Sequence, residues 1–253
     1  MAGTSEGAAV RAGAAAASAG AARPAWTDAR PRRGTVRGGG AAAWLNAWPL
    51  TAWAYERVWR PRSVGLLSGG AFSTERELAR LRAWASPLAG AAVLDVGTSA
   101  GLYARTLARE GAAVVALDAS RAFLGEAARR ARHERLAIEW VWGDAHALPF
   151  ADGSFDRVVV GATLNELSEP ARAVREIARV LRPDGRAWFM YARRAGRLGR
   201  PLQAALGLAG LRFPAPDELD AWAAAAGLRP GRREAYGGVV VASYGRRAGG
   251  SPG

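Results

Sequence analysis

Hydrophobic and polar positions follow two alternating periods from about residue 92 onward. Short apolar runs, typical of strands buried on both faces, are separated by longer segments with the spacing of amphipathic helices. Strands are predicted over 92–96, 113–117, 138–142, 156–161 and 186–191, and helices over 102–110, 121–133 and 170–181. Strands that alternate with helices are joined by right-handed crossovers, so the pattern predicts a doubly wound, mostly parallel α/β sheet.

The last part of the chain has a different pattern. A helix is predicted over 217–226, and two strand-like runs, 228–235 and 239–244, flank Tyr236-Gly237-Gly238. A short link that contains glycine favours an antiparallel hairpin. The sheet is therefore expected to end in a C-terminal antiparallel hairpin.

The segment before the sheet divides into two parts. Residues 1–40 are rich in Ala, Gly, Ser, Arg and Pro and show no hydrophobic periodicity, which predicts a disordered tail. An organelle-targeting segment is the minor alternative to a cytoplasmic protein with such an extension. Residues 41–88 are predicted to form a helical cap. Its aromatic stretch from Trp44 to Trp59 fits either a helix packed on the main domain or a lid over a pocket. Further along, the capping box Thr74-Glu75-Arg76-Glu77 predicts a helix that ends at about Ala85.

Composition excludes several classes of site. The 253 residues include no cysteine and two histidines, which excludes disulfides, thiolate sites and a cysteine nucleophile, and no metal site is predicted. The net charge is +13, and all 35 basic residues are arginine. These arginines are spread along the sequence from Arg11 to Arg247, whereas proteins that bind phosphate groups cluster their positive charge on one face. Nucleic-acid binding is therefore not predicted, and a patch that binds anionic lipid stays an alternative. No apolar run has the length of a membrane span.

The first strand leads into a glycine-containing turn, and an acid ends the second strand. Gly97 permits a tight turn and close approach of a ligand, and Gly101 lets the next helix begin close to the strand. Ligands of open α/β sheets bind beyond the carboxyl ends of the strands, where Asp118 is suited to accept hydrogen bonds from ribose hydroxyls. Together these features favour a cofactor that contains a nucleoside.

An acid precedes this turn, at a place where a dinucleotide would bring its pyrophosphate. Asp95 would repel that group, but it suits a cationic ligand such as an amino-acid end with a neighbouring sulfonium. S-adenosylmethionine is therefore favoured. A nicotinamide-dependent oxidoreductase and a non-catalytic binding protein remain alternatives.

Two further segments carry a family resemblance. Gly143-Asp144-Ala145-His146-Ala147-Leu148-Pro149-Phe150 resembles the GDAxxLPF segment of class I S-adenosylmethionine-dependent methyltransferases, and Leu181-Arg182-Pro183-Asp184-Gly185 resembles their LKPGG turn. With the first motif, residues from about 93 to 185 are similar to the small-molecule, UbiE-like type of this family. The resemblance implies an enzyme, a methyltransferase with a Rossmann-like, seven-stranded fold, whose cofactor-binding domain spans residues 89–253.

The resemblance also implies which residues bind S-adenosylmethionine. They all lie in strand ends or the segments that follow: Asp95, Gly97, Thr98, Ser99, Gly101, Asp118, Ala119, Asp144, Ala145 and Ala162. The first motif lines the methionine end, Asp118 holds the ribose, and Ala119 flanks the adenine. Asp144 accepts from the adenine amino group, and Ala162 borders the transferred methyl. Ser99 stands where the family more often has glycine.

Methyl transfer needs a general base only when the acceptor must lose a proton. Glu166 is the predicted base and Asn165 the predicted acceptor-orienting group, although either could instead cap the next helix. His146 is predicted to be a surface residue. The segment 192–214 is predicted to be an acceptor-side insertion: a flap, a basic amphipathic surface that meets membrane lipid, or a capping loop. The expected acceptor is a small, apolar or aromatic molecule, and the sequence does not indicate the oligomeric state.

Overall fold

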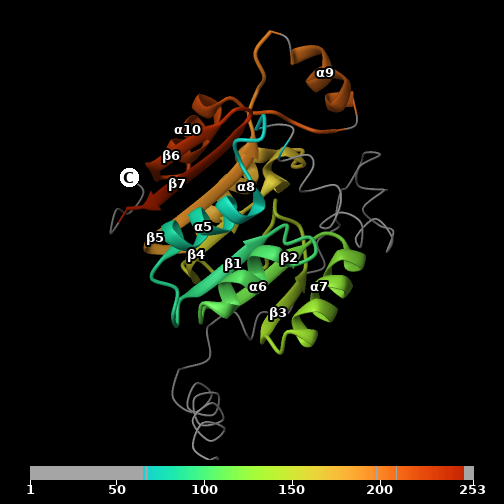
Figure 1. Cartoon of the computed structure of the whole chain (residues 1–253). Helices are drawn as coiled ribbons and strands as arrows, with labels where there is room; N and C mark the ends of the chain where they lie inside the picture. The colour runs from blue at the N-terminus through green and yellow to red at the C-terminus, as the bar shows by residue number, and fades with distance from the viewer. Residues whose placement is uncertain (1–64, 66–67, 198, 209, 248–253) are drawn as a thin grey trace, which may run out of the picture.

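The computed structural model describes residues 65, 68–197, 199–208 and 210–247 (Figure 1). The predictions of a disordered tail over 1–40 and of an aromatic helix or lid over 44–59 lie outside the described residues.

The described part of the chain forms one seven-stranded sheet. Its strand order is β3-β2-β1-β4-β5-β7-β6, in which β7 alone runs antiparallel to its two neighbours. The strands are β1 (Ala92–Val96), β2 (Ala113–Asp118), β3 (Ile138–Trp142), β4 (Phe155–Val160), β5 (Leu181–Ala192), β6 (Leu228–Tyr236) and β7 (Val239–Arg246). The predicted Rossmann-like, mostly parallel sheet with its C-terminal antiparallel hairpin is confirmed.

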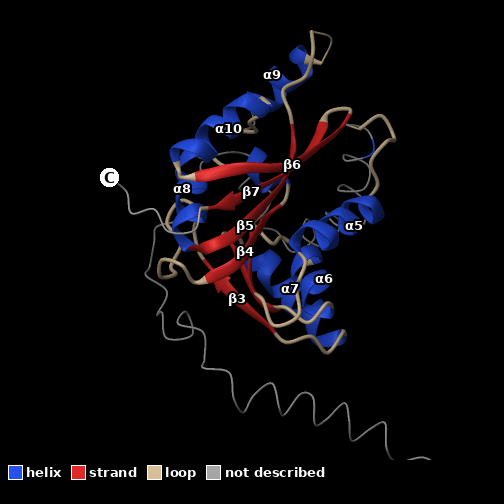
Figure 2. Cartoon of the chain, turned by 90° about the vertical axis from the view of Figure 1, so that its left-hand side faces the viewer, coloured by secondary structure: helices blue, strands red, loops and turns tan. Residues whose placement is uncertain are grey.

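Helices cover both faces of this sheet (Figure 2). One face carries α5 (Thr74–Ala85), α6 (Leu102–Arg109) and α7 (Arg121–His133), and the other carries α8 (Pro170–Val180) and α10 (Pro216–Ala225). Each face has its own cluster of buried apolar side chains, and the central strands contribute alternate residues to the two clusters. Because both faces are covered, β1 is buried along its whole length and reads as a continuous apolar run around Asp95.

The predicted capping box is one residue out of register. Ser73, not Thr74, precedes α5, and its hydroxyl accepts a hydrogen bond from the backbone amide of Arg76. This places Glu77 inside the helix, where it is fully buried and hydrogen-bonded to the hydroxyl of Tyr103 on α6. The Glu77 carboxylate therefore joins two helices instead of capping one.

The fifth strand is longer than predicted. It begins at Leu181, so the predicted turn 181–185 lies within it as an irregularity: Phe155 and Arg157 of β4 pair with Leu181 and Arg186. Asp184 takes a positive φ of 62° there. A local bulge against a neighbouring strand leaves no signal in hydrophobic periodicity. The insertion also contains a helix that was not predicted, α9 (Arg200–Leu208).

The strand order creates a switch point between β1 and β4. The chain continues from β1 to β2 on one side, whereas β4 pairs with β1 on the other. Segments that follow β1 and β4 therefore leave the sheet side by side, where open α/β sheets bind ligands. Among the described helices, none combines the length and apolarity that crossing a membrane requires.

Candidate functional site

The segments after β1 and β4 meet beyond the switch point. The Thr163 hydroxyl donates a hydrogen bond to the Gly97 carbonyl at 3.0 Å. A Cβ on Gly97 would lie only 2.2 Å from the Thr163 Cγ2 atom, and Gly97 has a φ of +68°. Gly97 is therefore required by this contact as well as by its backbone conformation, a reason that the sequence did not reveal.

Glycine is also required at position 101 for a reason beyond the one predicted from the sequence. It takes a φ of +82° and directly precedes α6. A Cβ there would approach Ala127 of α7 at 3.0 Å and Trp140 of β3 at 3.2 Å. The absent side chain thus lets α6 begin close to α7 and β3, not only close to β1.

Asp95 holds the first turn together. Its Oδ2 accepts hydrogen bonds from the Thr98 hydroxyl at 2.6 Å and from the Ala104 amide at 3.0 Å. The side chain is 1% exposed. Asp95 therefore connects the end of β1, the turn that follows it and the first turn of α6.

Asp118 joins the ends of β1 and β2. Its Oδ2 accepts from the Ser99 amide at 2.8 Å and its Oδ1 from the Ser120 amide at 2.7 Å. Burial raises the pKa of Asp118, and the amides of Ser120 and Ser99 oppose that rise without cancelling it. A carboxylate offers about four lone-pair sites, so each oxygen keeps a site for a ribose hydroxyl.

The third motif packs beside this acid. The Gly143 amide donates to the Asp118 carbonyl at 3.1 Å, and the Trp142 indole donates to the Ala119 carbonyl at 2.9 Å. Ala119 is exposed, and Ala145 is buried at the start of the next turn. The residues predicted to bind the ribose and those predicted to bind the adenine therefore lie next to each other, although they follow two different strands.

His146 is not the surface residue that was predicted. Its side chain is 13% exposed; Nδ1 lies 2.6 Å from the Asp144 Oδ1, and Nε2 accepts from the Glu169 amide at 3.2 Å. Because Nε2 accepts, Nδ1 carries the proton and donates to Asp144. The imidazole thus fixes one oxygen of Asp144 and anchors this turn to the start of α8.

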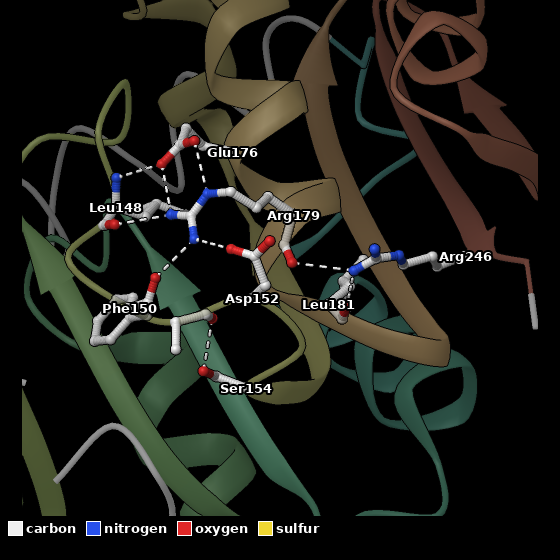
Figure 3. Close-up of polar contacts among 9 residues, drawn as sticks. Leu148, Phe150, Asp152, Ser154, Glu176, Arg179, Leu181 and Arg246 are labelled. Atoms are coloured by element: carbon white, nitrogen blue, oxygen red, sulfur yellow. Dashed lines mark hydrogen bonds and ion pairs between the residues drawn. The ribbon is translucent and has the colours of Figure 1, made fainter. Parts of the chain in front are cut away.

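Arg179 on α8 anchors the rest of this motif (Figure 3). Its guanidinium donates to the carbonyls of Leu148 and Phe150 at 3.0 and 2.8 Å and pairs with Asp152 at 2.7 Å. Glu176, one turn earlier, pairs with Arg179 at 2.8 Å and accepts from the Leu148 amide at 2.9 Å. Sequence reasoning missed this network, whose only local signal was the Glu176–Arg179 spacing.

The two predicted catalytic residues differ in their surroundings. Both follow β4, in and after a 3₁₀ turn, η3 (Ala162–Asn165). The Glu166 side chain is reached by solvent, yet the surrounding protein desolvates its carboxyl and the nearby Asp118 charge repels it. These two effects raise the pKa of Glu166 to about 7. Glu166 thus lies close enough to Asp118 for their charges to repel each other, and its carboxyl exchanges its proton near neutral pH.

Asn165 is buried and fully engaged. Its Nδ2 donates to the carbonyls of Ala192 and Arg212 at 2.8 and 2.6 Å, and its Oδ1 accepts from the Ala192 amide at 2.8 Å. Neither amide hydrogen is left for an acceptor. The geometry gives Asn165 a positioning role instead, since it ties together the two ends of the insertion that runs from β5 to α10.

Ser99 provides a test of whether this crevice suits a cofactor. Its φ is +51°, and its Oγ is buried without a hydrogen-bond partner among the described residues. An unpaired buried hydroxyl is unfavourable unless a ligand pairs with it. Together with the open sites on Asp118, this orphan group fits a polar ligand that lies across the 97–101 turn.

Comparisons with known proteins agree with this arrangement. Residues 94–189 match the methyltransferase domain family. The chain is 38% identical over 133 residues to a demethylmenaquinone methyltransferase of Clavibacter sepedonicus, covering 53% of this chain and 51% of that protein. Residues 94–189 therefore resemble the methyltransferase domain of class I S-adenosylmethionine-dependent enzymes of the UbiE-like type.

Two further comparisons describe the extent of this methyltransferase domain. An uncharacterized chloroplastic methyltransferase of Arabidopsis thaliana is 33% identical over 144 residues, which are 54% of this chain and 40% of that protein. The crystal structure of the YcgJ protein from Bacillus subtilis superposes with a TM-score of 0.62 at 19% identity, covering 69% of this chain and all of that one. The structural likeness shows the fold. The chain spans about half or less of the length of the curated relatives that it matches.

Proposed function

We propose that this protein transfers a methyl group from S-adenosylmethionine to a small, apolar or aromatic acceptor of the quinone-like kind. The observation that carries the proposal is the convergence of three separate motifs at one end of the sheet: Gly97 contacts Thr163, Ser99 donates to Asp118, and Gly143 donates to the Asp118 carbonyl. The demethylmenaquinone methyltransferase relative supports the acceptor class.

The residues present fit the cofactor in three places. Asp118 has one open site on each oxygen for a ribose hydroxyl, and Asp144 has its second oxygen for the adenine amino group, because His146 engages the first. The Ser99 hydroxyl supplies a further polar group in the turn. When bound, the cofactor supplies an electrophilic methyl group on a sulfonium. Ala119, Ala145 and Ala162, which also follow strand ends, would contact the cofactor in this proposal.

The protein's own contribution is alignment, exclusion of water and movement of one proton. An acidic acceptor would have to lose a proton when it takes the methyl group that the bound cofactor would supply. Glu166 takes that proton in this proposal, since its pKa of about 7 leaves much of it as a carboxylate at neutral pH. Thr163 positions the segment that carries Glu166, through its hydrogen bond to Gly97.

The decisive experiment separates cofactor binding from turnover. S-adenosylhomocysteine, the demethylated product, should raise the unfolding temperature of the full chain, by an amount equivalent to about 2.7 kcal/mol at 100 times Kd. NADH should have no effect. Stabilisation by NADH and not by S-adenosylhomocysteine would instead support the oxidoreductase alternative.

Turnover requires a second comparison. Metabolites of cells that carry the wild-type protein should include a compound heavier by one methyl group, which cells carrying the Glu166→Gln variant lack or contain at a lower level. Product binding without any such compound would favour a non-catalytic binding protein. We also infer a cytoplasmic location, with organelle targeting as the alternative because the Arabidopsis relative is described as chloroplastic.

A further inference from the structure

Helix α9 stands apart from the layers of the fold. Both views show it beyond the sheet and its covering helices, on the connection between β5 and α10 (Figures 1 and 2). None of its side chains is buried. Leu202 is 61% exposed and Leu208 is 92% exposed, and they are the large hydrophobic side chains exposed in the described part of the chain. A helix with apolar side chains and no core to pack against needs another partner.

The orientation of α9 is fixed on one side. Gln203 accepts a hydrogen bond from the Ala195 amide at 2.7 Å and donates one to the Arg193 carbonyl at 2.9 Å. Gln203 is also the one polar residue between Pro201 and Leu208. Because helix positions turn by about 100° per residue, Leu202 and Leu208 lie about 100° and 140° around the helix axis from Gln203, away from this tether. The exposed apolar surface is thus held by the protein and directed outward.

Positive charge surrounds this apolar surface. The sequence contains no Asp or Glu from Arg186 to Ala215. Of the arginines in this stretch, Arg194 pairs with Glu218 at 2.6 Å. By contrast, Arg197, Arg200 and Arg212 are exposed, and none forms an ion pair within the described residues. The surface therefore combines outward-facing leucines with unpaired guanidinium groups.

We propose that α9 and its flanking arginines, over residues 193–212, bind the surface of an anionic lipid bilayer. Apolar side chains that enter the interface while basic side chains meet lipid phosphates are the chemistry of an interfacial helix. A second copy of the chain fits less well, because the same positive charges would face each other. A nucleic acid would satisfy the arginines but leave Leu202 and Leu208 in water. This inference does not depend on the proposed methyl transfer.

Vesicle co-sedimentation of the full chain tests the proposal. The wild-type protein should sediment with vesicles of phosphatidylcholine and phosphatidylglycerol, and much less with vesicles of phosphatidylcholine alone. Two variants separate the contributions: Leu202→Ser with Leu208→Ser removes the apolar part, and Arg197→Gln with Arg200→Gln removes two charges. Each should weaken partitioning onto anionic vesicles roughly ten-fold or more.

The matched control is Arg229→Gln with Arg232→Gln, which removes two exposed arginines from β6 instead. It has the same net charge as the α9 arginine variant and should bind vesicles like the wild type. Equal losses in both arginine variants, unchanged binding of the leucine variant, or no binding of the wild type would each overturn the proposal. So would a wild-type dimer that the leucine variant converts to a monomer without any lipid binding.

A separate measurement keeps this test independent of the proposed activity. Affinity for S-adenosylhomocysteine and the unfolding temperature should be the same in all three variants, because each substituted side chain is exposed. Lipid binding lost together with the unfolding transition would mean that α9 supports the core, which contradicts the proposal. Failure of the cofactor to bind any form of the protein would contradict the proposed function and leave the lipid result unaffected.

Discussion

Replacing Asp118 tests the cofactor site and the electrostatics of the fold together. If its carboxylate accepts both ribose hydroxyls, Asp118→Ala removes two charge-assisted hydrogen bonds, each worth roughly 1.5–3 kcal/mol. Water partly replaces them in the variant, so we expect affinity for S-adenosylhomocysteine to fall about 10- to 100-fold, which corresponds to about 1.4–2.7 kcal/mol. Asp118→Asn should lose less, since the amide keeps one accepting oxygen.

The stability of the fold should change much less than the cofactor affinity. The pKa of Asp118 is raised in the folded protein, so the fold disfavours its charged form. A group with a raised pKa contributes stability that is complete below its unfolded pKa and is lost as the pH rises through the folded value. At pH 7 the ionised carboxylate is therefore a destabilising group. Asp118→Asn removes the charge but replaces one of the two oxygens that accept from Ser99 and Ser120 by an NH2 group. The two effects oppose each other, so the unfolding temperature of the unliganded protein at pH 7 should change little.

Asp156 offers a matched control at the other end of the sheet. Its carboxylate also accepts a hydrogen bond from a strand amide, that of Ala92, at 2.8 Å, and it forms an ion pair with Arg182 at 2.8 Å. Burial raises its pKa, but these two partners outweigh burial and leave it lowered. Its stabilising effect is present above the unfolded pKa and is lost as the pH falls through the folded value. Asp156→Asn should therefore lower stability at pH 7 and leave cofactor affinity unchanged.

Calorimetric titration with S-adenosylhomocysteine and thermal unfolding at pH 7 measure the cofactor affinity and the stability of these variants. The reasoning predicts a larger loss of stability for Asp156→Asn than for Asp118→Asn, and a loss of cofactor affinity for the Asp118 variants alone. Wild-type affinity in Asp118→Ala would mean that the ribose does not lie against this carboxylate. Equal destabilisation by both variants would show that the role assigned to burial at Asp118 is wrong.

Three further substitutions test other parts of the crevice. Gly97→Ala should destabilise the fold by roughly 1–3 kcal/mol through its clash with Thr163, whereas Gly125→Ala, at an open position of α7, should be neutral or stabilising in chemical denaturation. In the wild type the rate of methyl transfer should rise with pH, with a midpoint near pH 7. Glu166→Gln should lower turnover and abolish this rise, while the affinity for the product, measured by titration, stays nearly unchanged. Ser99→Gly should raise the unfolding temperature of the unliganded protein but weaken product binding; tighter binding would exclude the hydroxyl as a cofactor contact.

The parts of the fold that the sequence predicted best are those with a local signal. The bounds of β1, α7 and β3 agree with the predicted ranges, because their apolar periodicity reports burial directly. Helix α9 was missed for the same reason: it buries no side chain, so no burial pattern marked its bounds in the sequence. The early start of β5 depends on its pairing with β4, which periodicity does not encode.

The candidate site shows the same division. Sequence order and motif spacing were enough to place Gly97 and Asp118 at neighbouring strand ends. They were not enough for Asn165, whose side-chain partners lie 27 and 47 residues further along the chain. His146 was assigned to the surface because nothing nearby in sequence indicates that its ring would accept from the amide of Glu169. Contacts between segments that are far apart in the sequence determine these roles, and the pattern of a single sequence does not show which segments meet.

Three polar groups that the fold itself leaves unfavourable lie at or beyond the carboxyl ends of β1, β2 and β4. Ser99 combines a positive φ with an unpaired buried hydroxyl, and the pKa values of Asp118 and Glu166 are both raised. At the opposite end of the sheet, Asp156 is paired and its pKa is lowered. Selection for stability alone would remove the first three groups and keep the last. Their persistence at the carboxyl ends of the strands is therefore best explained by a ligand that pairs with them, which links the family resemblance to the chemistry of these particular residues.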